Sequence, residues 1–181
     1  MNFHMRILVA ITGASGIIYG SRLVGALRAS GQNVSVVVSE GAKKVAKAEG
    51  AALPRADYAE SGFSAPFASG SNAADALIVC PCSLKTWGEI ANGVGSSLIT
   101  RAAEVCLKER KKLVLVVRET PYSLIAIRNM ERVTLAGGIV LPASPGFYHK
   151  PRTVSDMVDF VVGKTMDSAG IPNKLFQRWG K

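Results

Sequence analysis

The sequence is poor in the residues from which disulfide frameworks and zinc sites are built. Among 181 residues it has three cysteines and two histidines. Cys80, Cys82 and Cys106 are an odd number without a CxxC pair, which is typical of reduced thiols. His4 and His149 add too few ligands for a structural zinc site. We therefore expect no metal and a reducing location.

Long hydrophobic runs are also missing. No apolar run approaches the ~20 residues that cross a bilayer. The first run, Ile7 to Ile11, is too short for the core of a signal peptide and leads straight into a glycine turn. These absences predict a cytoplasmic protein that does not enter a membrane.

Acidic residues and aromatic residues are scarce. Thirteen Asp and Glu stand against 22 Lys and Arg, for a net charge of +9, and aromatics make up 7%. The basic residues form short clusters, "KKVAK" and "LKERKK", without the interleaved aromatics of a single-strand binder. A nucleic-acid partner would need the basic helices to share one face and is disfavoured, whereas small phosphorylated molecules suit such a surface.

Apolar residues are abundant, at 48% of the chain with a mean hydropathy of +0.22. This predicts a sheet buried on both faces together with apolar contacts between subunits. Five β-branched runs have the composition of parallel strands: 6–11, 33–38, 76–80, 112–117 and 138–142. Helical patterns lie around them, at 16–30, 40–50, 84–92, 95–110, 121–136 and 153–169.

Alternating strands and helices predict an α/β fold. The expected architecture is a single-domain, doubly wound parallel sheet over residues 1–181, with helices on both faces in a Rossmann- or flavodoxin-like three-layer arrangement. The segment 51–73 is rich in Ala, Ser, Gly and Pro, and it is expected to be a long functional loop with at most one short strand.

Small, hydroxylated and charged residues follow every predicted strand. The successive segments are "TGASG", "SEG", "PCSLKT", "RETPYS" and "PASPGFYHKP". Ligands of such sheets bind beyond the carboxyl ends of the strands, where these segments meet. The sequence therefore predicts a binding site at this edge.

The opening turn indicates the class of ligand. A glycine-rich turn before a helix presents backbone N–H groups to an anion, although a tight turn without a ligand is the simpler alternative. Gly13, Gly16 and Gly20 do not fit G-x-G-x-x-G, and Tyr19 replaces the last glycine of the short-chain dehydrogenase pattern. Nicotinamide is therefore disfavoured. A mononucleotide phosphate or a flavin edge better suits the hydroxyls of Ser15, Ser39, Ser83 and Thr86.

Several motifs in one order resemble the UbiX-type flavin prenyltransferases: "TGASG", "CPCSLKT", "RAAEVCLKERKKLVLVVRETPYS", "LPASPGFYHKP" and "DFVVGK…GIP…RWG". The resemblance covers nearly the whole chain. It implies that dimethylallyl phosphate alkylates reduced FMN at N5 and then C6, without a metal. It also implies a homo-oligomer, typically a dodecamer, whose prenylated FMN serves a UbiD-type decarboxylase.

The resemblance assigns FMN to residues after four of the strands, namely Gly13, Ala14, Ser15, Ser39, Ser83, Leu84, Lys85, Thr86 and Arg118. Ser15 would lie near N5, while a plain helix cap is compatible with that role. Arg118 directly follows an apolar strand, which favours a ligand contact over a solvated charge.

The prenyl phosphate is assigned by the same resemblance to Ser69, Arg101, Lys108, Tyr148, Lys164 and Trp179, partly from neighbouring subunits. Lys164 replaces an arginine of some relatives, and Phe63 aligns with their loop tryptophan. The tail 170–181 would close over the site or a neighbouring subunit through Trp179. Surface charges at Lys108 and Lys164, and a structural ion pair at Arg101, are the alternatives.

The catalytic residues implied are Glu119, Ser15 and Lys108. Ring closure at C6 removes a proton from the flavin, and Glu119 would take it while cations hold the leaving phosphate. The alternative is a surface pair of Glu119 with Arg118. Cys80 and Cys82 are interpreted as packing residues, because no histidine nearby would activate them.

Two other functions are possible for this sequence. A flavin-dependent cysteine decarboxylase of the same fold uses an active-site histidine before the third strand discussed here, where this chain has none. An FMN-binding carrier would keep the glycine turn but would need neither Glu119 nor the residues around Tyr148.

Overall fold

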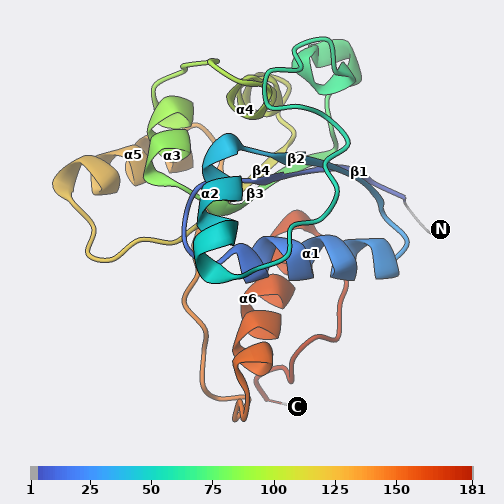
Figure 1. The fold of residues 1–181 in the computed structure, drawn as a ribbon, viewed down its shortest axis with the longest axis vertical. Helices are drawn as coiled ribbons and strands as arrows, with labels where there is room; N and C mark the ends of the chain where they lie inside the picture. Colours follow the sequence, from blue (N-terminus) through green and yellow to red (C-terminus); the bar gives the residue numbers. More distant parts are fainter. Residues whose placement is uncertain (1–3, 181) are drawn as a thin grey trace.

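The structure is a computed structural model that describes residues 4–180. Five parallel strands form one sheet in the order β2-β1-β3-β4-β5, the doubly wound order of flavodoxin-like folds (Figure 1). The strands are β1 (Arg6–Ile11), β2 (Asn33–Val38), β3 (Ala76–Cys82), β4 (Lys112–Val117) and β5 (Ile139–Pro142). The predicted parallel α/β fold is therefore confirmed.

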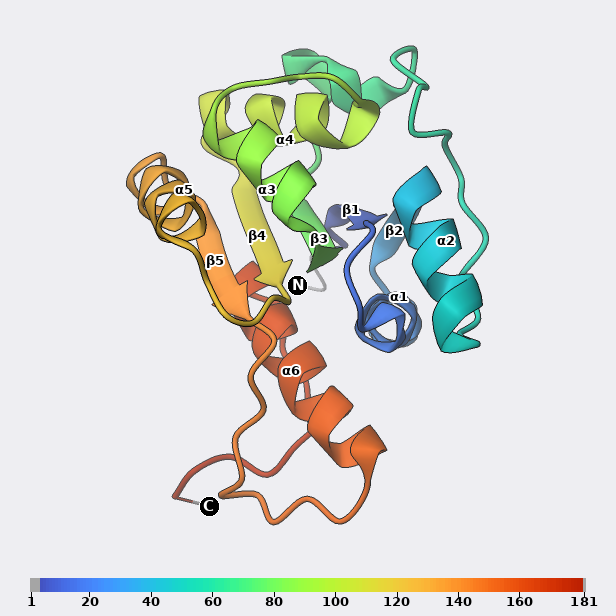
Figure 2. The same ribbon diagram turned by 60° about the vertical axis from the view of Figure 1, so that its left-hand side comes forward.

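Helices cover both faces of the sheet, because alternate side chains of one strand are buried in two different cores. Ile7, Val9 and Ile11 point into a core with the first, second and last helices, whereas Leu8 and Ala10 point into a second core with the other three (Figure 2). The helices are α1 (Ile17–Ala29), α2 (Glu40–Glu49), α3 (Leu84–Ala91), α4 (Leu98–Lys108), α5 (Leu124–Leu135) and α6 (Val154–Ala169). Burial on both faces explains the continuous apolar strands.

The end of the third predicted strand differs from the structure for a physical reason. β3 runs two residues past Cys80, through Pro81, and its register with β4 shifts between Val79 and Cys82 because proline has no N–H for the ladder. The segment 51–73 is mostly loop, as predicted. It contains one bridge from Tyr58 to Val37 and two 3-10 turns, η1 (Pro66–Ala68) and η2 (Gly70–Asn72).

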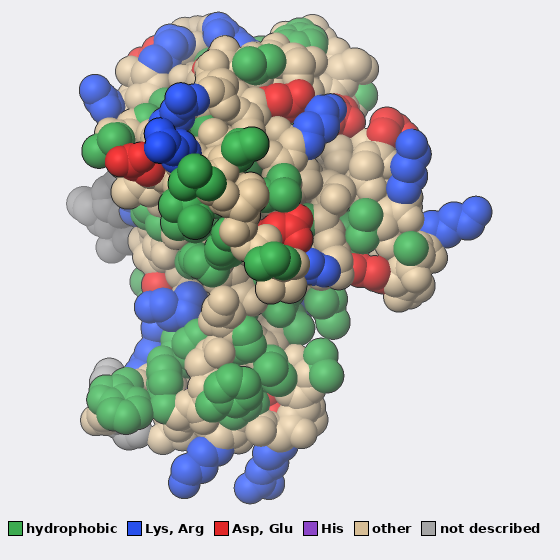
Figure 3. All heavy atoms as spheres, turned by 90° about the vertical axis from the view of Figure 1, so that its left-hand side faces the viewer, with side chains coloured by type: hydrophobic (Ala, Val, Ile, Leu, Met, Phe, Trp, Pro, Cys, Tyr) green, Lys and Arg blue, Asp and Glu red, His purple; other side chains and the backbone are tan. Residues whose placement is uncertain are grey.

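An extension below the sheet is formed by α6, the segment 143–153 and the C-terminal tail (Figure 2). Hydrophobic side chains gather over this extension and, higher on the same face, around α5 (Figure 3). In the part of the chain that the structure describes, no helix is long and apolar enough to cross a membrane.

Candidate active site

The site is built beyond the carboxyl ends of β1 and β3, the neighbouring strands from which the strand order runs in opposite directions. Thr12 joins the two strand ends: its hydroxyl donates to the Pro81 carbonyl at 2.8 Å and accepts from the Ser83 amide at 2.8 Å. Such a switch point opens a crevice at the carboxyl ends of parallel strands. The loops after β1 and β3 therefore meet where the sequence predicts a ligand.

A cavity of about 390 Å³ occupies this crevice. Its volume falls in the range of ~300–1,000 Å³ typical of small-molecule sites. It is lined by Gly13, Ser39, Glu40, Gly41, Glu60, Ser83, Leu84, Lys85, Thr86 and Glu119. Seven of these ten residues belong to the predicted set. The loops after β1, β2, β3 and β4 thus converge on one cavity.

The starts of α2 and α3 supply polar donors to the cavity. The Ser39 hydroxyl caps α2 by accepting from the Ala42 amide at 3.0 Å, and Ser83 caps α3 by accepting from the Thr86 amide at 3.3 Å. A Cβ added to Gly13 would lie 3.0 Å from the Gly41 backbone, so these two turns approach closely only because both residues lack side chains. Hydroxyls, N–H groups and two helix N-termini are a donor set that suits the phosphate of FMN.

Ser15 and Glu49 meet at the start of α1. Both oxygens of the Glu49 carboxylate accept backbone N–H groups, from Gly16 at 2.7 Å and from Ile17 at 3.0 Å, and the carboxylate also accepts the Ser15 hydroxyl. Partial burial raises the pKa of Glu49, but these hydrogen bonds and the charge of Arg118 lower it more, to below its ordinary value of 4.5. Glu49 is therefore held as a carboxylate beside Ser15.

Sequence reasoning missed Glu49. It ends an amphipathic helix rich in lysine, where a glutamate has the pattern of a solvated charge. One signal was available: α1 begins at Gly16, whose missing side chain leaves the first N–H groups of the helix in need of an acceptor from elsewhere.

Arg118 and Glu119 lie at the end of β4 and are half-buried. The positive charge of Arg118 helps to lower the pKa of Glu49 and opposes the rise that burial causes in the pKa of Tyr19. Glu119 lines both the 390 Å³ cavity and a neighbouring cavity of about 560 Å³ with Tyr122. No ion pair joins Arg118 to Glu119 among residues 4–180.

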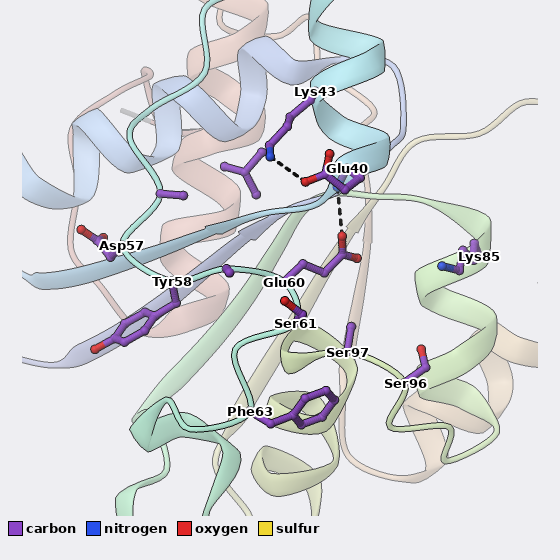
Figure 4. A pocket seen from close by; sticks show the side chains of 13 residues that line it. Glu40, Lys43, Asp57, Tyr58, Glu60, Ser61, Phe63, Lys85, Ser96 and Ser97 are labelled. Atoms are coloured by element: carbon purple, nitrogen blue, oxygen red, sulfur yellow. Dashed lines mark hydrogen bonds and ion pairs between the residues drawn. The ribbon is translucent and has the colours of Figure 1, made fainter.

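A third cavity of about 550 Å³ adjoins the first and shares Glu40, Glu60 and Lys85 with it. Figure 4 shows Glu60 reaching from the long loop to the start of α2, where its carboxylate accepts the Glu40 amide at 2.9 Å. The ring of Phe63 lines the same cavity, so this loop borders the predicted site as its composition suggested.

The residues predicted for the prenyl phosphate fall into two groups. Ser69, Arg101 and Lys108 gather at the 3-10 turns: Arg101 donates to the Ala68 carbonyl at 3.1 Å, and Lys108 lies against Gly70. Arg101 also pairs with Glu104, and Lys108 pairs with Glu109, as the structural alternatives required.

The second group belongs to the extension. The rings of Tyr148 and Trp179 meet edge to face at 5.3 Å, and Lys164 is exposed on α6. The 3-10 turns and this extension lie at opposite ends of the molecule (Figure 1). One chain therefore does not bring the two groups together. Lys181, the last residue of the predicted tail, lies outside the described residues.

The cysteines and histidines take no part in the site. Burial raises the pKa of the Cys80 and Cys82 thiols far above the ordinary value, which leaves them unreactive. His4 contacts the Gly31 carbonyl, and His149 stacks on Phe160 in the extension. Among the described residues no group of three or more His, Cys, Asp or Glu is placed to hold a metal ion.

Comparison with known proteins agrees with this geometry. Residues 1–166 match the family described as Flavoprotein. The chain is 47% identical to the flavin prenyltransferase UbiX of Methanothermobacter thermautotrophicus, over 96% of this chain and 94% of that protein.

Two solved structures are similar over nearly their whole length. The first is a crystal structure of AnUbiX (PadA1) in complex with FMN and dimethylallyl pyrophosphate, with a TM-score of 0.93, 41% identity and 98% of each chain covered. The second is a dodecameric FMN-dependent UbiX-like decarboxylase from Escherichia coli O157:H7, with a TM-score of 0.89 and 36% identity, covering 98% of this chain and all of that one. The chain therefore belongs to the Flavoprotein family and, within it, to the UbiX flavin prenyltransferases, with FMN as its cofactor.

Proposed function

We propose that residues 1–181 form one flavin prenyltransferase domain in which the cavity between β1 and β3 binds FMN and dimethylallyl phosphate is the donor. The observation that carries this proposal is the convergence of six predicted FMN residues and the predicted base Glu119 on the 390 Å³ cavity. When bound in its reduced form, FMN supplies the N5 and C6 atoms that receive the dimethylallyl group.

Ser15 and Glu49 hold and move a proton on one side of the site. The Ser15 hydroxyl donates to the Glu49 carboxylate, so its oxygen keeps lone pairs that point away from Glu49 and can accept a proton from a bound ligand. The carboxylate is anchored by two backbone N–H groups of α1. A hydroxyl bonded to an ionised carboxylate is a short proton path, and Arg118 balances its charge.

Glu119 is the general base that we assign to the second bond. It is half-buried, it borders two of the cavities, and its Oε1 accepts the Thr120 amide at 2.9 Å, which fixes the carboxylate. Burial raises the pKa of the neighbouring Tyr122, and the charge of Glu119 raises it further. Tyr122 therefore stays protonated beside the base.

The donor phosphate is bound by cations from more than one subunit. Ser69, Arg101 and Lys108 belong to the region of the 3-10 turns, and Tyr148, Lys164 and Trp179 belong to the extension. These two regions lie at opposite ends of the molecule (Figure 1), so a complete phosphate site would join regions of different copies. The dodecameric relative supports a homo-oligomer of that size. We further infer that the prenylated FMN passes to a UbiD-type decarboxylase in the cytoplasm, a location that the three free, buried cysteines support.

The test is mass spectrometry of the flavin after anaerobic incubation of the oligomer with reduced FMN and dimethylallyl phosphate. The expected product is heavier by one isoprene unit. Ser15→Ala and Glu119→Gln should each slow its formation by about 100-fold or more, within the range of a lost acid–base group. Glu131→Gln, an exposed carboxylate on α5, is the matched control and should keep full activity.

Unmodified flavin in well-folded, FMN-loaded oligomer, with either the monophosphate or the diphosphate, would contradict the proposal. It would favour the FMN-binding carrier instead. Heavier flavin that forms equally fast in Glu119→Gln would keep the reaction and remove Glu119 from it.

A further inference from the structure

The C-terminal tail packs against α6. After Gly170 the chain folds back along the helix, and Ile171 and Phe176 are buried. The ring of Phe176 packs on Phe160 with 4.7 Å between centroids. A Cβ on Gly163 would lie 2.7 Å from the Phe176 ring, so the glycine leaves the space that the tail fills.

Three polar side chains next to this packing, those of Asp167, Asn173 and Arg178, bind one another, and we call them the clasp. Arg178 binds Asp167 with two nitrogens, Nη1 on Oδ2 and Nη2 on Oδ1 at 2.9 Å. Asn173 donates to Asp167 Oδ1 at 2.9 Å and to the Gly163 carbonyl at 3.0 Å. The guanidinium of Arg178 also lies 4.5 Å above the Phe176 ring. A guanidinium that binds a carboxylate through two nitrogens has a fixed orientation, whereas the single ammonium of a lysine would not.

The clasp ends one residue before Trp179. That tryptophan is 79% exposed, yet its ring sits edge-on against Tyr148 at 5.3 Å. An exposed side chain ordinarily moves among many orientations. Since Trp179 has little packing of its own, the orientation of its ring depends on how its neighbour Arg178 is held.

We propose that Asp167, acting through Arg178, is a positioning residue that holds Trp179 against Tyr148 for the prenyl donor. This rests on the proposed function, in which both aromatic residues belong to the donor site. Asp167 does not itself touch the donor. It reduces the number of orientations that Trp179 must lose when the donor binds.

The same helix offers a matched control. Asp159 on α6 also binds an arginine with both oxygens, Arg22 of α1 at 2.7 and 3.2 Å. The two aspartates are similarly exposed, at 21% for Asp159 and 27% for Asp167. Asp167→Asn and Asp159→Asn would each weaken a similar aspartate–arginine ion pair, but only the pair of Asp167 includes a residue of the tail.

The experiment compares Asp167→Asn with Asp159→Asn in the FMN-loaded oligomer. Time-resolved fluorescence anisotropy, in a Trp87→Phe background, reports the motion of Trp179 alone, because these are the two tryptophans of the chain. In Asp167→Asn we expect a new fast component in the anisotropy decay of Trp179. We also expect the KM for dimethylallyl phosphate to rise by roughly 3- to 10-fold with a smaller fall in kcat. Asp167→Glu, which keeps the carboxylate, should recover both the slow decay and the parent KM. Asp159→Asn should behave like the parent.

Three results would overturn the inference. Unchanged motion of Trp179 in Asp167→Asn would show that the clasp does not position Trp179, and it would leave the proposed function unaffected. Equal loosening in Asp159→Asn would show that any lost ion pair on α6 has this effect. An unchanged KM in Trp179→Ala would show that Trp179 has no role at the donor, and both its proposed function and its positioning by Asp167 would fall.

Discussion

At the scale of single residues, the carboxylate of Glu49 does the work of a helix cap. α1 begins at Gly16 with a φ of 98° and without a side-chain cap of its own. Glu49, from the last turn of α2, supplies the missing acceptor to two N–H groups. A negative charge at that position also interacts favourably with the helix dipole. The same carboxylate holds Ser15, so the cap and the proposed proton path share one group.

Replacing Glu49 with glutamine should lower the free energy of unfolding by about 0.5–1 kcal/mol at neutral pH, the usual value of a charge at a helix end. The pKa of Glu49 is lower in the folded protein than its ordinary 4.5, so its contribution is fully present above 4.5 and is lost as the pH falls through the folded pKa. Urea unfolding of both proteins across the acidic range should therefore show the difference shrinking. A difference that grows on acidification would contradict this account of Glu49.

At the scale of elements, α1 lies directly on β3 at a glycine. A Cβ on Gly20 would lie 2.3 Å from the Cys80 carbonyl oxygen, and a backbone atom cannot move aside as a side chain can. Gly25, five residues along the same helix, is exposed and has nothing within 4 Å of its added Cβ. The close approach of Gly20 brings the start of α1, and with it Ser15, to the switch point.

Gly20→Ala should therefore destabilise the protein by about 1–3 kcal/mol, the cost of overpacking a well-packed contact. Gly25→Ala should stabilise it by about 0.5–1 kcal/mol, because alanine is the better helix former. Thermal unfolding followed by circular dichroism measures both changes. Equal effects of the two substitutions would mean that α1 does not rest on β3 as described.

The sequence was sufficient to predict the elements because the central strands β1, β3 and β4 are buried on both faces. Three strands, β1, β2 and β4, begin and end at the predicted residues: 6–11, 33–38 and 112–117. A continuous β-branched run predicts a strand in a parallel sheet that is covered on both faces. The predicted FMN residues also converge, because parallel strands end at one edge. Glu49 and Asp167 could not be predicted in this way. Each depends on how two segments separated in the sequence pack against each other, and a carboxylate on a helix carries no local sign of that contact.

At the scale of the whole molecule, α5 exposes large apolar side chains at both of its ends. Leu124, Ile125, Ile127 and Leu135 are 50–81% exposed, and hydrophobic side chains gather over this region in Figure 3. Monomeric proteins rarely leave such a patch uncovered. The high hydropathy of the chain and the dodecameric relative both favour contacts between copies here.

Ile125→Lys should disrupt the oligomer, because it places a charge among the exposed apolar side chains in the first turn of α5. Thr134→Lys on the same helix adds the same charge at a polar, exposed position and should not. Light scattering after gel filtration gives the mass of each assembly. An unchanged mass for Ile125→Lys would exclude this turn of α5 from the interface.

The separation of the two groups of donor residues leads to the last prediction, which concerns how chains cooperate. Assayed with the donor well below its KM, Lys108→Ala and Trp179→Ala should each be strongly impaired as pure oligomers, because each removes a contact to the donor. If one site takes Lys108 from one copy and Trp179 from another, oligomers reassembled from equal amounts of both variants contain sites with both residues intact. Random mixing makes these about a quarter of all sites in a symmetric homo-oligomer, so the rate of prenylated flavin formation should return to roughly a quarter of the parent rate. If both residues served the site of their own chain, no mixture would contain an intact site and no activity would return. The rate in the mixed oligomer therefore decides whether the opposite ends of this molecule meet across subunits.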